Sequence, residues 1–228
     1  MIPKTIHQIH LGPHELSPQE LSWRDSWTQL NTGWQYKLWR DEHVKELELP
    51  KCVVENCDNY AELSDVYRLK ILQLHGGLYV DTDFACLKPI DPLFSQKEFA
   101  VFQQDKKTIN NACIASAPNT PQITKLVDGL SDRAEWYKNC MNNYGHWECH
   151  PTVTIRKFQW MDNSSYKFGP EYLTSTLGIK MAIPDGVDCD IKKVYPFDWK
   201  EPHRVNENFH KTTPEAYAVH YWNTSWLS

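Results

Sequence analysis

Five stretches of the chain have hydrophobic patterns that predict regular structure. Between Ala61 and Leu74, apolar residues recur every three or four positions, which is typical of an amphipathic helix. Further helices are expected from about Pro18 to Leu30 and from Pro121 to Leu130, and strands from Phe99 to Gln103 and from Asn111 to Ala115. Because helical and extended segments alternate, we expect an α/β fold with one mixed sheet flanked by helices, rather than a bundle or a sandwich.

A short apolar run with two aspartates, residues 78–83, follows the first of these helices. Gly76 and Gly77 precede it and can take the positive φ that ends a helix and turns the chain into a strand. Alternation along the strand would then place Asp81 and Asp83 on the same side. Two carboxylates in this position suit Mn²⁺ or Mg²⁺, which would hold a diphosphate. Two solvated aspartates at a surface strand end are the alternative.

Two charged residues, Asp65 and Arg68, stand on one side of the expected helix at 61–74. At this spacing they can pair with each other on the helix surface. They can also present an acceptor and a planar fork of donors to a ligand. The spacing alone leaves both alternatives open.

Together, residues 61–68, Leu72 and residues 75–83 resemble the signature of glycosyltransferase family 32, the DXD-containing sugar transferases that include yeast-type mannosyltransferases. The pattern is also similar to the catalytic domain of the large clostridial glucosylating toxins. The resemblance continues, in the order of the family, through residues 2–9, 26–27 with 34–39, 110–118, 169–170, 220 and 225–226. Residues 2–9 would form the first strand, and residues 26–27 with 34–39 the second. This resemblance implies a GT-A fold with a single Rossmann-like mixed sheet, and one catalytic domain over residues 1–228.

The resemblance also implies an activity. The enzyme would be a retaining transferase that uses Mn²⁺ or Mg²⁺ and moves a sugar from a nucleoside-diphosphate sugar, with uridine as the preferred base, to a glycan or other hydroxyl acceptor. Asp83 would bind the metal directly, and Asp81 would hold the ribose and a metal-bound water. Asp65 and Arg68 would hold hydroxyls of the transferred sugar, with Arg68 close to the diphosphate. No nucleophile stands out, so we expect attack on the same face as departure.

Residues near the carboxyl end would complete the site by the same resemblance. His220, on a short strand from Ala218, would join the metal shell, and a satisfied core histidine is its alternative. Asn223 and Ser225 would add oxygen ligands, and Ser225 and Trp226 would contact the donor. The other implied donor contacts are Gln8, Ile9, His10, Tyr60, Ser64, Tyr79, Asp81, Asn110 and Asn111.

Two of these implied contacts carry their own alternatives. Relatives often have Trp at the position of His10, and a smaller ring buries less surface against a base. Asn110 and Asn111 could instead form a turn, because Asn tolerates the left-handed backbone.

Composition narrows the possible partners. The formal net charge is −5 and no stripe of Lys and Arg is present, which argues against a nucleic-acid partner. Aromatic residues make up 13% of the chain, and their faces suit sugar rings and bases, although most should fill the core. No apolar run approaches the roughly 20 residues of a transmembrane segment, and no leader precedes Ile2.

We therefore expect a cytoplasmic protein, either bacterial or viral in a host cytoplasm. A trimmed Golgi domain is less favoured, because the sequon at Asn223 would place a glycan inside the implied site.

Seven cysteines, an odd number, favour free thiols in a reducing compartment. Cys140, His146, Cys149 and His150 cluster in the sequence, but their spacing matches no common zinc pattern. We therefore expect a loop near the acceptor, in which Trp147 and His150 would contact sugar.

Two other functions fit parts of the sequence. A nucleotide-sugar-binding protein without turnover would carry the same residues. An aspartate-nucleophile phosphohydrolase would be phosphorylated on Asp81, but its motif normally has Thr or Val where this chain has Ala85. The phosphohydrolase also leaves Asp65 and Arg68 without a role.

Overall fold

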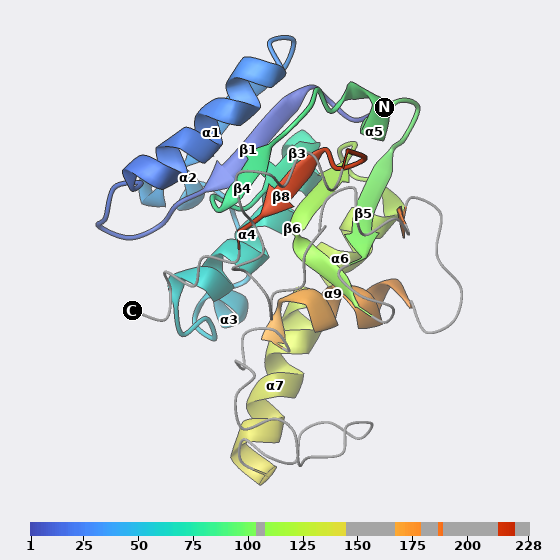
Figure 1. The fold of residues 1–228 in the computed structure, drawn as a ribbon. Helices are drawn as coiled ribbons and strands as arrows, with labels where there is room; N and C mark the ends of the chain where they lie inside the picture. The colour runs from blue at the N-terminus through green and yellow to red at the C-terminus, as the bar shows by residue number, and fades with distance from the viewer. Residues whose placement is uncertain (104–107, 145–166, 179–186, 189–213, 222–228) are drawn as a thin grey trace.

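A computed structural model describes residues 1–103, 108–144, 167–178, 187–188 and 214–221 (Figure 1). A mixed sheet of six strands has the order β2-β1-β3-β6-β5-β7, and β4 pairs with β8 in a second, two-stranded sheet. The strands are β1 (Thr5–Ile9), β2 (Gln35–Trp39), β3 (Gly77–Val80), β4 (Phe84–Cys86), β5 (Phe99–Gln103), β6 (Ile109–Ser116), β7 (Val187–Asp188) and β8 (Ala218–His220). The helices are α1 (Pro18–Leu30), α2 (Asp41–Val44), α3 (Lys51–Val54), α4 (Tyr60–His75), α5 (Asp91–Phe94), α6 (Pro121–Asp128), α7 (Leu130–Tyr144) and α9 (Pro170–Leu177). The expected α/β class with a mixed sheet is confirmed.

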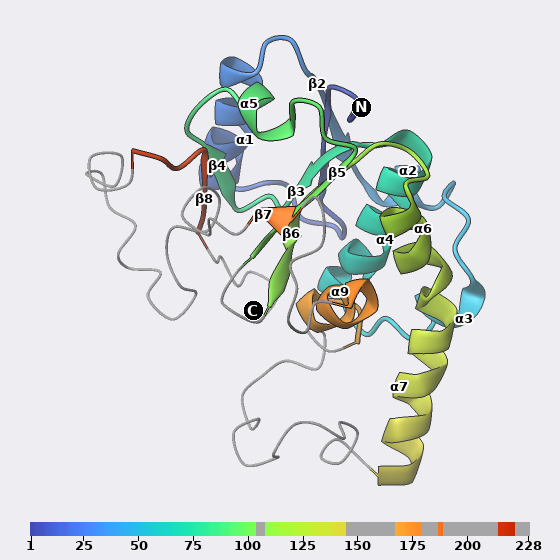
Figure 2. The ribbon, with the colours of Figure 1, turned by 90° about the vertical axis from the view of Figure 1, so that its right-hand side faces the viewer.

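The central sheet is covered on both faces. Figure 2 shows α1, β4 and β8 on one side of the sheet and α4, α6 and α9 on the other. Strand β3 lies between these layers: Leu78 and Val80 pack with Trp27 in one apolar cluster, whereas Tyr79 packs with Leu72 in the other. Burial on both faces explains why β3 reads as a continuous apolar run in the sequence.

Local capping signals fix the starts of α1 and α4. The Ser17 hydroxyl accepts from the Glu20 amide at 3.2 Å, and the Glu20 carboxylate accepts from the Ser17 amide at 2.8 Å, which is a capping box. The Asn59 side chain caps α4 by accepting from the Glu62 amide at 2.9 Å. The predicted bounds of α1 are confirmed, and α4 extends one residue beyond the prediction at each end.

The glycine pair after α4 turns the chain directly into β3. Gly76 has φ +63° and Gly77 has φ +101°, both in the region that favours glycine. A Cβ on Gly77 would lie 2.5 Å from the Thr5 carbonyl oxygen, so the close approach of β1 also requires glycine here. The predicted role of this pair is confirmed.

Three predicted elements differ from the structure. The helix expected up to Leu130 ends at Asp128, and α7 begins at Leu130. At this break the Leu126 carbonyl accepts a 2.5 Å hydrogen bond from the Tyr172 hydroxyl, and a Cβ on Gly129 would lie 2.8 Å from the same hydroxyl. Strand β6 is longer than expected, and residues 26–27 belong to α1 rather than to the second strand. No helix in the described ranges has the length and hydropathy needed to cross a bilayer.

Candidate donor and metal site

The two aspartates of the DXD motif lie in the turn between β3 and β4. The Asp81 amide donates to the Ala112 carbonyl of β6 at 3.0 Å, and the Phe84 amide donates back to the Asp81 carbonyl at 3.3 Å. Asp81 and Asp83 lie on the same side, as expected, but strand alternation is not the cause, because β3 ends at Val80. The turn nevertheless brings the two carboxylates together, as described next.

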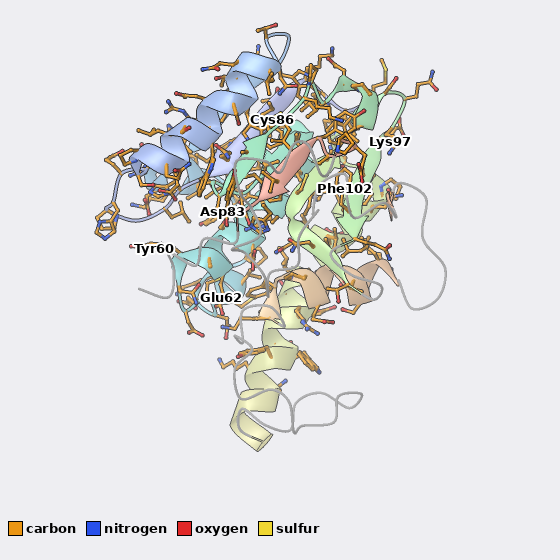
Figure 3. All side chains as sticks on the ribbon, in the orientation of Figure 1. Tyr60, Glu62, Asp83, Cys86, Lys97 and Phe102 are labelled. Carbon is orange, nitrogen blue, oxygen red and sulfur yellow. The ribbon has the colours of Figure 1, made fainter. Side chains whose placement is uncertain are left out.

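A third potential ligand reaches these carboxylates from the distant strand β8. His220 lies opposite Phe84 in the β4–β8 pairing, and the two rings stack with centroids 4.4 Å apart and planes 5° apart. The His220 Nε2 lies 3.0 Å from Asp83 Oδ1. Figure 3 shows Asp83 beside the end of β8, above the helix that begins at Tyr60. Ligand atoms of Asp81, Asp83 and His220 lie within 4.8 Å of one another.

The chemistry of this donor set fits a divalent cation. Carboxylate oxygens are the ligands that Mn²⁺ and Mg²⁺ prefer, and neutral imidazole also binds Mn²⁺. Burial raises the pKa of Asp81; Arg68 opposes this rise and Asp83 adds to it. A bound cation would therefore relieve the cost of two adjacent carboxylates.

The guanidinium of Arg68 joins the candidate metal ligands to a second cluster of polar side chains. Its Nη2 lies 2.9 Å from Asp65 Oδ1 and 3.2 Å from Asp81 Oδ1, and its Nη1 donates to the Asn111 carbonyl at 2.8 Å. The Asn111 side chain donates to Asp65 Oδ1 at 2.7 Å. The Asp65–Arg68 pair is thus present, but it is buried within the molecule and directed at the DXD turn rather than lying on an open helix surface.

The carboxyl group of Asp65 has a raised pKa. Burial raises its pKa to about 7; Arg68 lowers the pKa, whereas Asp81 raises it further. Near neutral pH, the Asp65 carboxyl can therefore act either as an acceptor or as a donor of hydrogen bonds.

The hydroxyl groups of Ser64 and Tyr79 connect Arg68 to Asp81 by a second route. Arg68 Nη2 donates to Ser64 Oγ at 3.0 Å, Ser64 Oγ lies 3.0 Å from the Tyr79 hydroxyl, and that hydroxyl donates to Asp81 Oδ1 at 2.6 Å. The guanidinium also lies over the Tyr79 ring, 4.4 Å from its centroid. Six of the sequence-predicted site residues therefore form one connected network: Ser64, Asp65, Arg68, Tyr79, Asp81 and Asn111.

The other predicted donor contacts differ in their surroundings. Gln8 reaches it directly, since its Nε2 donates to the Asp81 carbonyl at 3.0 Å. Ile9 is a core residue with 5% exposure. His10 follows β1 and its Nε2 bonds the His14 carbonyl at 3.0 Å, and Tyr60 is exposed at the start of α4. Contacts of these residues with a donor stay predictions.

Asn110 and Asn111 lie within β6, so the alternative that they form a turn is wrong. The β5–β6 register shifts at this point, from the Val101–Ile114 pair to the Phe102–Asn110 pair. Such an irregularity bends a strand and redirects its side chains, which accounts for the contact between Asn111 and Asp65.

Several predicted residues lie outside the described part of the chain. These are Asn223, Ser225, Trp226, His146, Trp147, Cys149 and His150, together with the side chain of Cys140. Among the described residues, Cys52, Cys57, Cys86 and Cys113 are free thiols, as predicted.

Sequence reasoning missed two residues that support the DXD turn. The Tyr36 hydroxyl donates to Gln8 Oε1 at 2.6 Å, and the Trp27 indole N–H donates to the Phe84 carbonyl at 2.9 Å. Trp27 could be read only as an apolar position of α1, and nothing in the pattern of β2 distinguishes Tyr36. Their contacts depend on how α1, β1 and β2 pack together.

Sequence comparison places this site in a known group. Residues 18–100 match the family described as "Glycosyltransferase sugar-binding region containing DXD motif". An uncharacterized glycosyltransferase of Acanthamoeba polyphaga mimivirus is 27% identical over 155 residues, covering 64% of this chain and 62% of the viral protein. Inositol phosphoceramide mannosyltransferase 3 of Schizosaccharomyces pombe is 30% identical over 230 residues, covering 98% of this chain and 56% of the yeast protein. The chain thus spans less than two thirds of the length of these relatives.

Solved structures agree on the fold. The UDP-bound glycosyltransferase domain from the YGT toxin aligns with a TM-score of 0.55 at 10% identity, covering 94% of this chain and 89% of that domain. The catalytic domain of alpha-toxin from Clostridium novyi aligns with a TM-score of 0.55 at 12% identity, covering 77% of this chain and 72% of that domain. Residues 18–100 therefore resemble the DXD-containing glycosyltransferases, and the chain has the GT-A fold of the solved glycosyltransferase domains.

Proposed function

We propose that this chain transfers a hexose from a uridine-diphosphate sugar to a hydroxyl group of a glycan or related acceptor, with Mn²⁺ or Mg²⁺ and with retention of anomeric configuration. The observation that carries the proposal is the convergence of Asp81, Asp83 and His220 within 4.8 Å, directly beside Arg68. The UDP bound to one fold neighbour supports the choice of donor. The name of the fission-yeast relative supports transfer of a hexose such as mannose.

Asp83 and His220 would hold the divalent ion, and Asp81 would complete the acidic face. When bound, such an ion supplies Lewis-acid charge that stabilises a departing diphosphate. Asp81 Oδ1 already accepts from Tyr79 and contacts Arg68, so these residues fix the orientation of the Asp81 carboxylate. The protein thereby presents its acidic groups in a preorganised arrangement.

Arg68 would act on the leaving group. Its guanidinium is 4% exposed and is held by Asp65, Asp81, Ser64 and the Asn111 carbonyl, so its positive charge has a fixed position. Fixed charge of this kind stabilises negative charge that develops in a transition state. Asp65, with its pKa near 7, would hold hydroxyls of the transferred sugar.

Retention would proceed by attack on the face from which the diphosphate leaves. The acidic residues of the described site are already engaged, because Asp65 bonds Asn111 and pairs with Arg68, and Asp81 and Asp83 form the cation-binding group. In this route a phosphate oxygen accepts the proton of the acceptor hydroxyl, and the protein mainly positions groups. A glycosyl adduct on any carboxylate, detected by mass spectrometry of the intact protein, would contradict this route.

A thermal-shift screen of nucleoside-diphosphate sugars, with Mn²⁺ or with EDTA, tests the proposal. UDP-sugars should raise the melting temperature in Mn²⁺ and much less in EDTA, because a ligand that binds only the folded state stabilises it. Hydrolysis of the selected donor, followed by NMR, should first release the sugar in the anomeric form of the donor. Binding without hydrolysis or transfer to any acceptor would support the binding-only alternative, and phosphate release through phospho-Asp81 would support the phosphohydrolase.

A further inference from the structure

Two side chains, the buried Gln8 of β1 and the half-buried Tyr36 of β2, hold the peptide group that follows Asp81. The Gln8 Nε2 donates to the Asp81 carbonyl at 3.0 Å, and the Tyr36 hydroxyl donates to Gln8 Oε1 at 2.6 Å. Gln8 is completely buried, so its amide must find its partners within the protein.

The place of Gln8 in the sheet explains why a side chain is used here. The parallel pairing of β1 with β3 ends at the pair of His7 and Tyr79. Beyond that pair, the Gln8 amide extends the hydrogen bonding from β1 to Asp81, while the Asp81 amide bonds β6 through Ala112. The backbone of Asp81 is thus held from both neighbouring strands.

The chemistry of the partners fixes which way the amide of Gln8 faces. A carbonyl oxygen can only accept, so the NH₂ group of Gln8 must face Asp81 and its oxygen must face Tyr36. The hydroxyl of Tyr36 supplies the matching donor. Burial raises the pKa of Tyr36, so this hydroxyl keeps its proton.

We propose that Gln8 and Tyr36 are positioning residues that orient Asp81 and thereby set the affinity of the site for its divalent ion. This role rests on the proposed function, and it differs from the direct donor contact that the family resemblance implies for Gln8. Neither residue needs to touch the metal or the donor. Groups that orient metal ligands in this way commonly change metal affinity by about 10- to 100-fold when they are removed.

Titration calorimetry of the full chain with Mn²⁺ alone, without donor, tests this role. Tyr36→Phe removes one hydroxyl and should weaken Mn²⁺ binding about tenfold. Gln8→Leu should weaken binding at least as much, and the double variant should bind no more weakly than Gln8→Leu alone, because Tyr36 acts only through Gln8. Tyr172→Phe is the matched control: it removes the buried hydroxyl that bonds the Leu126 carbonyl, so it should lower stability and leave Mn²⁺ affinity unchanged.

The outcomes separate this inference from the proposed function. If the wild type binds Mn²⁺ and Tyr36→Phe, folded by circular dichroism, binds it equally well, the inference is wrong. It is also wrong if the two substitutions weaken binding independently, or if Gln8→Leu weakens UDP binding in EDTA as strongly as in Mn²⁺, which would indicate direct donor contact. A wild type that binds no Mn²⁺ with or without UDP would contradict the proposed function itself.

Discussion

Two clusters of buried charge contact α4, and they differ in their balance of charge. At the start of the helix, Lys167 Nζ donates to the Asn56 carbonyl at 2.7 Å, to Asp58 at 2.7 Å and to Glu62 at 2.9 Å. Burial works to lower the pKa of Lys167, but its hydrogen bonds to Asp58 and Glu62 outweigh burial and raise the pKa. All three donors of this ammonium are used. Because Asp58 is largely exposed to water, the buried charges of this cluster are those of Lys167 and Glu62, and they balance each other.

The second cluster, one helical turn further along α4, carries an excess of negative charge. Asp65, Asp81 and Asp83 lie around the single guanidinium of Arg68, and burial raises the pKa of both Asp65 and Asp81. A balanced cluster ties the segment before α9 to α4, which is a structural role. The unbalanced cluster would be stabilised by a bound cation, and groups with perturbed pKa values of this kind are typical of functional sites.

Among the substitutions that distinguish the two clusters, neutralising Asp81 should have the largest effect. Asp81→Asn keeps an acceptor for Tyr79 but removes a metal-facing charge, so turnover should fall by about a hundredfold or more. In EDTA at pH 7, the free energy of unfolding should rise, because a carboxylate whose charged form is disfavoured by burial is removed. Donor hydrolysis assays and urea titrations measure the two effects. Asp58→Asn is the control in the balanced cluster and should leave turnover unchanged; a destabilised Asp81→Asn would contradict the charge argument.

Removing the lysine of the balanced cluster should lower the stability of the protein and leave its metal affinity unchanged. Lys167→Met leaves Glu62 buried without its cation, so the free energy of unfolding should fall by about 3 kcal/mol. Mn²⁺ affinity of the folded protein should stay the same, because the cluster does not contact the DXD turn. Urea unfolding and calorimetry test this pair of outcomes. A weaker metal site in a folded variant would show that the two clusters are coupled.

The raised pKa of Asp65 should make the stability of the protein depend on pH. Its pKa is about 7 in the folded protein, against an ordinary value of 3.8, so between these values the folded state holds a proton that the unfolded state has lost. Stability therefore falls as pH rises from about 4 to 7, by at most about 1.4 kcal/mol per pH unit for this group. Asp65→Asn should remove that contribution. A stability difference between wild type and variant that stays constant over this pH range would contradict the raised pKa.

Local signals made much of the fold predictable from the sequence. The start of α1 depends on Ser17, Pro18 and Glu20, which lie within four residues of the chain. The helix has the predicted bounds. The turn from α4 into β3 depends on the positive φ of Gly76 and Gly77, a local signal that the sequence shows directly. In each case the deciding interactions lie within a few residues of one another.

The rest of the site depends on contacts between distant segments. Asp83 meets His220 because β4 pairs with β8, and no local pattern specifies that pairing. The resemblance to a family predicted His220 where spacing could not. The contact between Tyr36 and Gln8 depends on the register of β1 and β2, which is set by packing of the whole sheet.

The affinity of the protein for UDP, measured by titration calorimetry with Mn²⁺ and with EDTA for the wild type and Asp83→Asn, tests the central claim most directly. Because Asp83 lies in the DXD turn and contacts His220, its carboxylate should be required for any effect of the metal on donor binding. The wild type should bind UDP at least about tenfold more tightly with Mn²⁺ than with EDTA, and Asp83→Asn should bind it equally in both. A folded Asp83→Asn variant that keeps the full effect of Mn²⁺ would contradict the account.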